Sequence, residues 1–371
     1  MQDVTQSVDC NDIIRILYLA ILDREPDNIG LDFFSHKLSS DEMTLREIGQ
    51  TLLHSDEFKA SVGKHGNETE QIQFTDFRVY PGYSQEDLAI FSRFDTTGVG
   101  PAPGFLTDWI GSRTRISSLW QACEPYENTV MALPVPGDYH ADAIEWVGTL
   151  KAVLAARGSF SVMELGAGYG PWLAASCAAA QLAGISELHL CGVEADPGRF
   201  RLLSQNIDDN DLSRHDIALH QAAIGVKPGR ARWPRIVDPA NDSGVRPLRP
   251  GNLEDRSYLA NRLDDTIEVK IIAMGPLLRT RPVWDLIHID VQGTEVELCR
   301  GCLGDLTARA RYLVVGLHSR KLDGDLIELL LDAGWVLEHE KPTRMVYHPG
   351  IPMMWMSKND GTQVWRNPKI P

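Results

Sequence analysis

A run of alternating glycines between residues 164 and 170 constrains the fold of this chain more than any other feature. The sequence Glu-Leu-Gly-Ala-Gly-Tyr-Gly directly follows the apolar residues 160–163. Glycine has no Cβ, so its backbone can adopt torsion angles that are closed to other residues and can let a ligand approach closely. The pattern therefore predicts a buried strand, a tight turn and then a helix.

The carboxylate at the head of this turn, Glu164, indicates the charge of the ligand. The spacing acid-x-Gly-x-Gly-x-Gly differs from the Gly-x-Gly-x-x-Gly spacing of dinucleotide-binding turns. A carboxylate repels a diphosphate but attracts the cationic methionine end of S-adenosylmethionine. The turn therefore predicts a methyl-donor site that includes Glu164, Gly166, Gly168, Tyr169 and Gly170.

The composition limits the classes of function. The chain has 371 residues, enough for one large domain and a small one, and its formal net charge of −15 disfavours binding to nucleic acid, which needs a basic surface. No apolar run reaches the roughly 20 residues of a membrane span, and residues 1–11 are polar, unlike a signal peptide. Six scattered cysteines predict reduced, mostly buried thiols. We therefore expect a cytoplasmic protein.

From about residue 136, strand-like and helix-like segments alternate. This pattern predicts an α/β fold with a Rossmann-like, doubly wound, mostly parallel sheet of seven strands. The predicted strands are 160–165, 188–193, 217–223, 267–272, 286–290, 311–317 and 335–339, with an antiparallel edge pair at 345–348 and 353–357. The predicted helices are 141–156, 171–183, 198–206, 294–301 and 322–333.

We predict four parts along the chain. They are a small all-α domain at 1–65, an aromatic-rich covering segment at 66–135, a donor-binding domain at 136–350 and a C-terminal extension at 351–371. In the first part, three helical patterns precede the sequence Ser-Asp-Glu-Phe. The residues Tyr18, Leu22, Arg24, Asp27, Gly30, Ser55, Glu57 and Phe58 resemble a helical domain of surface-associated bacterial proteins that is related to phycobilisome linkers. The resemblance does not settle what this domain does, and we expect a module for protein interaction or oligomerisation.

Ligands of an open α/β sheet bind at the carboxyl ends of its strands. The second predicted strand ends at Glu194, 24 residues after Gly170, where a carboxylate can accept two hydrogen bonds from a ribose diol. Ala195 follows it. Ala223, at the end of the third predicted strand, leaves space for an adenine ring, although close strand packing explains it equally well.

Two further predicted strands end in chemically reactive residues. Asp290 is expected at the mouth of the site beside the donor methyl group, and His318 emerges one strand away. Glu295 falls in the first turn of the next helix, where it either stabilises the helix dipole or takes part in catalysis. His288 is expected to lie deeper, as a buried histidine with its hydrogen bonds satisfied.

Together these segments resemble the FkbM-type methyltransferases, over roughly residues 140–345. The resemblance rests on the glycine turn, on Glu194 and Asp196, on residues 289–301 and on the strand that ends in His318. Gln292 and Thr294 replace residues usual in that family, and Glu164 replaces its usual aspartate. The resemblance implies a class I methyltransferase fold and S-adenosylmethionine-dependent O-methylation of sugars or natural products, with S-adenosylhomocysteine as the product.

In the expected mechanism, a base removes the proton of an acceptor hydroxyl during in-line methyl transfer. His318 is the first choice for this base and Asp290 the second, with Arg320 and Trp172 as further substrate contacts. A Mg²⁺ ion held by Asp290 with Asp264 or Asp265 is the less favoured alternative. Two rival functions remain: a nicotinamide oxidoreductase, and a donor-binding scaffold without catalysis whose helical domain binds a partner. The expected acceptor is a glycan or polysaccharide precursor, or else a polyketide or peptide product.

Overall fold

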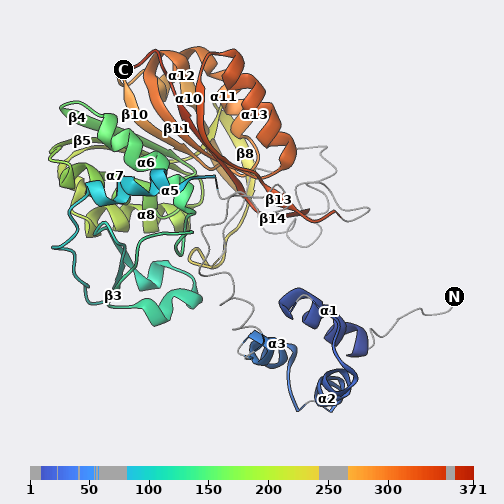
Figure 1. Ribbon diagram of the computed structural model, residues 1–371. Helices are drawn as coiled ribbons and strands as arrows, with labels where there is room; N and C mark the ends of the chain where they lie inside the picture. The colour runs from blue at the N-terminus through green and yellow to red at the C-terminus, as the bar shows by residue number, and fades with distance from the viewer. Residues whose placement is uncertain are drawn as a thin grey trace. The chain divides into compact units, whose positions relative to one another are not determined.

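The computed structural model describes residues 10–22, 24–40, 42–53, 55, 57, 82–241, 266–347 and 356–371. The chain divides into two compact units, Met1–Arg78 and Val79–Pro371 (Figure 1). The predicted boundary at residue 65 lies outside the described residues. In the described parts of the chain, no helix is both long and apolar enough to cross a bilayer.

The first unit contains three helices, α1 (Cys10–Leu22), α2 (Asn28–Ser39) and α3 (Leu45–Leu53). Its small core consists of Ile14, Tyr18, Phe34, Ile48 and Leu52. The described motif residues have structural roles here. The Asp27 side chain accepts the N–H of Gly30 and so caps α2, and Arg24 Nη2 donates to Glu57 Oε2 at 2.7 Å. The motif thus fixes the ends of the helices, whereas Phe58 lies outside the described residues.

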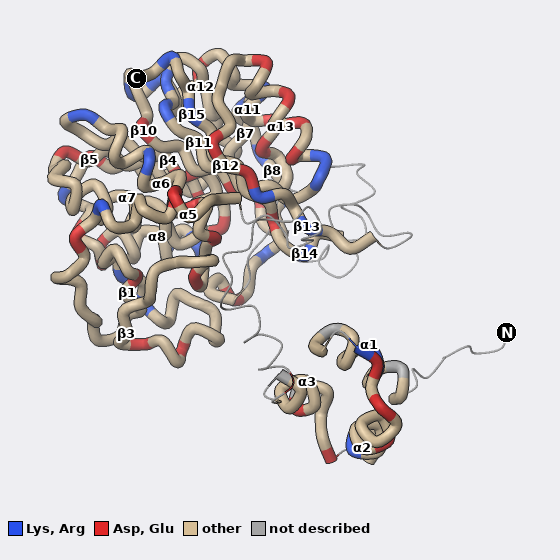
Figure 2. Tube along the Cα trace, viewed as in Figure 1, with Lys and Arg blue, Asp and Glu red and all other residues tan. Residues whose placement is uncertain are grey.

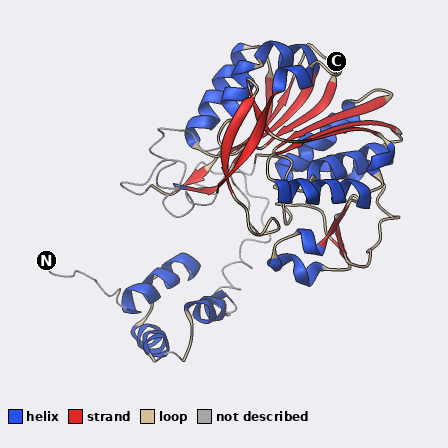
Figure 3. Ribbon diagram, turned by 180° about the vertical axis from the view of Figure 1, so that it is seen from behind, coloured by secondary structure: helices blue, strands red, loops and turns tan. Residues whose placement is uncertain are grey.

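The second unit is built on a seven-stranded sheet with helices on both faces (Figures 1 and 3). The strand order is β12 (Val336–Lys341), β15 (Gly361–Arg366), β11 (Ala310–Leu317), β10 (Trp284–Ile289), β4 (Ser159–Leu165), β5 (Glu187–Glu194) and β6 (Asp216–Gln221). All neighbours are parallel except β15, which is antiparallel to β11 and β12. The predicted Rossmann-like class I methyltransferase fold is therefore confirmed.

Two hydrophobic layers flank this sheet. One lies under α6 (Ala143–Ala155), α7 (Pro171–Leu182) and α8 (Pro197–Asp209) and includes Phe160 and Val162 of β4. The other lies under α10 (Met274–Leu278), α11 (Glu295–Gly301), α12 (Leu303–Arg309) and α13 (Arg320–Asp332) and includes Met163 and Leu165 of the same strand. Alternate residues of β4 thus enter opposite layers, as strand geometry requires.

The membership of the sheet corrects two predictions. The segment 267–272 forms β9 (Thr266–Ala273), which pairs with β7 (Ala223–Gly225) and β8 (Gly229–Pro234) in a separate three-stranded sheet. Its place in the main sheet is taken by β15. The predicted C-terminal extension at 351–371 therefore contains a strand of the main sheet, and the boundary at residue 350 is wrong.

Strand β15 was not predicted because its sequence contains polar residues. Gln363 is fully buried, where its Nε2 donates to the carbonyl oxygen of Asp323 and its Oε1 accepts from Trp365 Nε1. Because these hydrogen bonds satisfy the polar groups, the buried strand can contain polar residues, and its sequence therefore lacks the apolar run expected of a buried strand. The predicted edge pair is also different: β13 (Arg344–Met345) pairs with β14 (Ser357–Asn359), and residues 348 and 353–355 lie outside the described residues.

Residues 82–135 form short elements that pack onto the sheet domain. These are α5 (Gln85–Leu88), η1 (Ala89–Arg93), β1 (Phe105–Thr107), β2 (Arg113–Arg115), η2 (Ile116–Ser118), η3 (Gln121–Tyr126) and β3 (Thr129–Val130). The rings of Phe91 and Phe94 meet the Trp109 ring edge-on, and Trp109 meets Trp146 of α6 with 5.6 Å between centroids. This aromatic contact extends the core beyond the sheet and its helices.

Candidate active site

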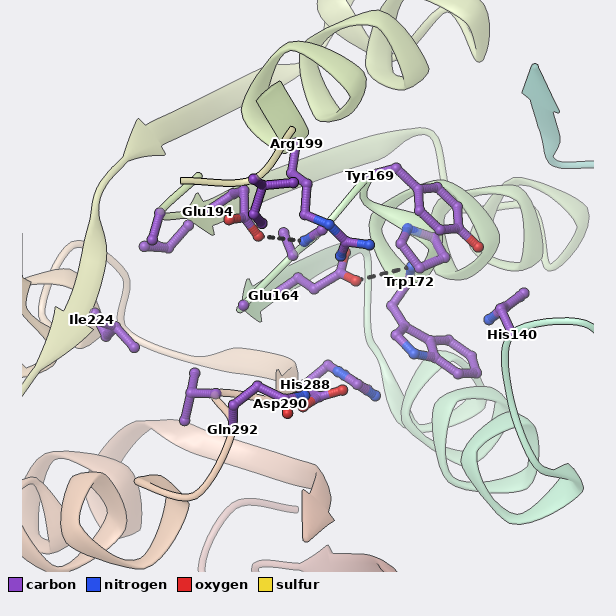
Figure 4. A pocket seen from close by; sticks show the side chains of 18 of the residues that line it. His140, Glu164, Tyr169, Trp172, Glu194, Arg199, Ile224, His288, Asp290 and Gln292 are labelled. Carbon is purple, nitrogen blue, oxygen red and sulfur yellow. Dashed lines mark hydrogen bonds between the residues drawn. The ribbon is translucent and has the colours of Figure 1, made fainter. Parts of the chain in front are cut away.

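A cavity of about 640 Å³ lies at the carboxyl ends of β4, β5 and β10. Most of the residues predicted for the donor line it. They are Glu164, Gly166, Gly168, Tyr169, Glu194, Ala195, Ala223 and Asp290. Side chains from these separate strands converge on the same space (Figure 4). The volume falls within the range of about 300–1,000 Å³ that is usual for small-molecule sites.

The glycine turn requires glycine at two of its positions for steric reasons. Gly166 and Gly170 both have positive φ, +77° and +79°. A Cβ at Gly166 would lie 1.8 Å from the carbonyl oxygen of Asp290, and a Cβ at Gly170 would lie 2.5 Å from Leu203 Cδ1. The turn therefore packs its backbone directly against the end of β10, which leaves bare backbone facing the cavity.

Glu164 joins the turn to the next helix. Its carboxylate accepts the backbone N–H groups of Trp172 and Leu173 at 3.3 and 2.9 Å, in the first turn of α7. Burial raises the pKa of this carboxyl to about 7, against the opposing effects of His288 and of those hydrogen bonds. Glu164 thus holds the helix N-terminus toward the cavity, a structural role that the sequence did not predict.

Glu194 ties the end of β5 to the glycine turn. It accepts the N–H of Gly168 at 2.8 Å and that of Asp196 at 2.6 Å. Burial raises the pKa of Glu194 to about 7. An ionised carboxylate offers about four lone-pair directions, so two remain for a ligand. Arg199, in the first turn of α8, also lines this part of the cavity.

Small and apolar residues form the wall beyond Glu194. Ala195, Ala223 and Trp233 pack together in one cluster, and Ile224 continues this wall. Ile224 of β7 and Trp233 of β8 were not predicted from the sequence. A flat, apolar ring system fits a wall of this kind.

Aromatic rings form the opposite wall. The rings of Trp172 and His288 stack with centroids 5.1 Å apart, and His140 meets Trp172 edge-on. His288 Nε2 lies 3.3 Å from Glu145 Oε2, so this buried histidine is hydrogen-bonded, as expected, although it also lines the cavity. Trp120 and Tyr139 extend the wall from the covering segment and the loop before α6; neither was predicted.

At the end of β10, the Asp290 carboxylate faces both the cavity and His318. His318 Nε2 lies 3.2 Å from Asp290 Oδ1, and its Nδ1 lies 3.0 Å from Glu295 Oε1. Burial lowers the pKa of His318, but the charges and hydrogen bonds of Glu295 and Asp290 outweigh it and raise that pKa well above the usual range. Burial raises the pKa of Asp290, but His318 outweighs it and keeps that pKa below its ordinary value.

This geometry is unsuitable for His318 as the base. Both ring nitrogens face carboxylates, the side chain is 10% exposed, and the residue is not among those that line the cavity. Asp290 does line it, and its side chain is 42% exposed.

The structure does not support the predicted substrate contact of Arg320. Arg320 begins α13, points toward Asp323 at 3.7 Å and does not line the cavity. Asp264 and Asp265, the suggested partners of Asp290 for Mg²⁺, lie outside the described residues.

Sequence comparison relates the chain to proteins of two kinds. Residues 2–62 match the family DUF4214, a domain of unknown function. Over 278 residues the chain is 29% identical to a protein of Jannaschia sp. (strain CCS1) named "Putative methyltransferase", a match that covers 75% of this chain and 98% of that protein.

Comparison with solved structures gives more distant similarities. Methyltransferase FkbM from Methylobacillus flagellatus KT is 15% identical, with a TM-score of 0.35, over 60% of this chain and 55% of that one. Precorrin-6y C5,15-methyltransferase from Geobacter metallireducens GS-15 is 13% identical, with a TM-score of 0.32, over 61% of this chain and 88% of that one.

Proposed function

We propose that this protein is an S-adenosylmethionine-dependent methyltransferase that methylates a hydroxyl group of a neutral sugar, glycan or natural-product acceptor. The observation that carries the proposal is the hydrogen bond that joins the glycine turn to Glu194 in the lining of one cavity. The bare backbone at Gly166 suits the amino-acid end of the donor. The Glu194 carboxylate at the end of the next strand suits its ribose, and the apolar wall at Ala223 suits its adenine. The name of the Jannaschia relative is consistent with this reading.

The charge of the cavity supports this donor over a nicotinamide dinucleotide. Among the described residues that line it, five are carboxylic acids and Arg199 is the one Lys or Arg. A diphosphate would meet this field unfavourably, whereas the sulfonium and ammonium groups of S-adenosylmethionine would be stabilised. When bound, this donor supplies an electrophilic methyl group.

The negative charge of the cavity also limits the kind of acceptor. Basic and acidic residues are interspersed along the described trace (Figure 2), and the described lining of the cavity is mostly acidic, which disfavours a polyanion as the acceptor. Aromatic walls at Trp172 and Tyr139 suit the apolar faces of a sugar ring or a polycyclic product. We therefore infer a neutral, hydroxyl-bearing acceptor between this wall and Asp290.

Asp290 takes the role of proton acceptor in this proposal, and His318 positions it. As the oxygen–carbon bond forms and the sulfur–carbon bond breaks, the hydroxyl proton passes to the exposed Asp290 carboxylate, leaving a methyl ether and neutral S-adenosylhomocysteine. The contact between His318 Nε2 and Asp290 Oδ1 fixes the carboxylate while its other oxygen remains available. Trp172 orients the acceptor ring.

Calorimetric titration of the purified chain tests the donor assignment. We expect binding of S-adenosylhomocysteine and none of NADH, and a loss of about 1–3 kcal/mol of binding free energy in Glu194→Gln, because a charged hydrogen bond is lost. Glu187→Gln is the matched control, since Glu187 begins the same strand and its side chain is 69% exposed. Equal affinity in both variants would refute the role of Glu194, and binding of NADH alone would favour the oxidoreductase.

Formation of S-adenosylhomocysteine with candidate acceptors tests the reaction. Neutral glycosides are expected to support turnover, and bulk tRNA is not. Asp290→Asn should lower kcat strongly while it leaves the affinity for S-adenosylhomocysteine within about threefold. If Asp290→Asn kept full turnover, the proton-acceptor role would be wrong. If Asp290→Asn also kept full function in cells while the helical unit alone bound the biological target, the protein would be a donor-binding scaffold without catalysis.

A further inference from the structure

Three carboxylates surround one imidazole where β10, β11 and the turn between β14 and β15 meet. His318 Nε2 lies 3.2 Å from Asp290 Oδ1 and 3.9 Å from Asp360 Oδ2. Atoms that share a metal ion at about 2.0–2.2 Å lie about 3–4 Å from one another. Each of the two carboxylate oxygens therefore stands at a distance from the imidazole nitrogen that is typical of two ligands of one metal ion.

The other ring nitrogen of His318 supports the same reading. Its Nδ1 lies 3.0 Å from Oε1 of Glu295, a side chain that is fully buried. A histidine that binds a metal through one nitrogen usually gives its other N–H to a buried carboxylate, which fixes the ring. The backbone N–H of Gly293 donates to the same Oε1 at 2.8 Å, so Glu295 is itself held in place.

The carboxylates around His318 lack enough positive charge to balance them. Glu295 Oε2 is buried and has no hydrogen-bond partner among the described residues. In the described part of the chain, His318 is the cation that contacts Asp290, Glu295 and Asp360. One imidazolium cannot balance three carboxylates, and an unpaired buried carboxylate oxygen is costly.

We propose that a divalent cation displaces the Nε2 proton of His318 to solvent and is bound by that nitrogen, Asp290 and Asp360 at the edge of the donor cavity, with Glu295 positioning His318. The mixed set of one imidazole and two carboxylates suits Mn²⁺ or a similar transition ion better than Mg²⁺, which prefers oxygen ligands alone. Asp290 and Asp360 both line the cavity, so the remaining positions of the ion face it.

The site also suggests a role, which rests on the proposed function. An ion that faces the cavity can bind two neighbouring oxygens of an acceptor and lower the pKa of the hydroxyl that reacts. The acceptor class would then be a vicinal diol or a comparable pair of oxygens, as sugars and hydroxylated natural products provide.

Titration with Mn²⁺, followed by the electron paramagnetic resonance signal of the free ion, tests the site without donor or acceptor. We expect one bound Mn²⁺ per chain in the wild type and in the control Asp332→Asn, which alters an exposed acid at the end of α13. Asp360→Asn and Asp290→Asn should weaken binding by about tenfold or more. Because the Asp360 side chain is 61% exposed, Asp360→Asn is expected to fold normally, which circular dichroism checks.

Each result has one reading. No bound Mn²⁺ in the wild type, or equal affinity in Asp360→Asn, Asp290→Asn and Asp332→Asn, would overturn the metal site. Glu295→Gln separates a positioning role from a structural one: it should weaken Mn²⁺ binding by about 10–100-fold while the wild-type unfolding cooperativity is kept. Binding of S-adenosylhomocysteine, measured without metal, reports on the proposed function alone, so the failure of one proposal is distinguishable from the failure of the other.

Discussion

Replacing Glu164 with glutamine should change how the stability of the protein depends on pH. The Glu164 carboxyl is 2% exposed and has a pKa of about 7 in the folded chain, against 4.5 as the ordinary value. Between these values the unfolded chain loses the proton and the folded chain keeps it. The unfolded state then binds fewer protons, so the folded state loses stability as pH rises from about 4.5 to 7.

The size of this effect follows from the shift in pKa. A difference of about 2.5 units, at 1.36 kcal/mol per unit, amounts to about 3 kcal/mol when complete, of which about 2–3 kcal/mol falls between pH 5 and pH 8. The glutamine side chain in the variant does not titrate, and its amide oxygen can still accept the N–H of Leu173. The free energy of unfolding of Glu164→Gln, relative to wild type, should therefore rise by about 2–3 kcal/mol over that range.

Urea unfolding at pH 5, 6, 7 and 8, followed by tryptophan fluorescence, measures this difference. Glu127→Gln serves as the control because Glu127 is exposed, and its difference from wild type should stay flat. Groups that titrate in both proteins cancel in the comparison. A flat or falling difference for Glu164→Gln would show that burial does not raise the pKa of Glu164 in the folded chain, and the argument from burial would be wrong.

The remaining predictions concern the turn and the sheet. Gly166→Ala should abolish folding or cost several kcal/mol, because its Cβ would overlap the Asp290 carbonyl, whereas Gly324→Ala in α13, with open space around it, should stabilise by about 0.5–1 kcal/mol in urea unfolding. A chain of residues 79–371 should fold by circular dichroism, whereas a chain of residues 1–350 should not, because it lacks the buried Val364 and Trp365 of β15. A soluble, cooperative 1–350 chain would contradict the assigned strand order.

The local part of the fold could be predicted from the sequence. Strands β4, β5, β10 and β11 are short apolar runs, and the helices that follow them begin and end close to the predicted residues. The errors concern pairing partners. The alternating pattern of β9 is compatible with any sheet, and the polar residues Gln363 and Thr362 make β15 difficult to recognise as a buried strand. The sheet to which each of these two strands belongs could therefore not be predicted from its own sequence.

The site divides in the same way. The glycine turn, Glu194 and Asp290 are each recognisable within a few residues of sequence, and the fold brings them to one cavity. The environment of His318 depends on Glu295, 23 residues earlier, and on Asp360, 42 residues later. The contact with Asp360 depends on the pairing of β15 with β11, which the sequence did not reveal. A histidine that appears free in the sequence is for this reason fixed between carboxylates in the structure.

The charge of the cavity connects the donor with the cation site. Glu164 and Glu194 face the proposed donor half, where a bound sulfonium and ammonium would favour their ionised forms. Asp290 and Asp360 line the part of the cavity that we propose for the acceptor, where a neutral sugar would offer no positive charge. Two carboxylates beside a neutral acceptor need a counter-charge to hold its oxygens close, and His318 is already shared with Glu295. In the proposed reaction, a divalent ion at this position would balance this excess negative charge and hold the acceptor hydroxyl close to Asp290.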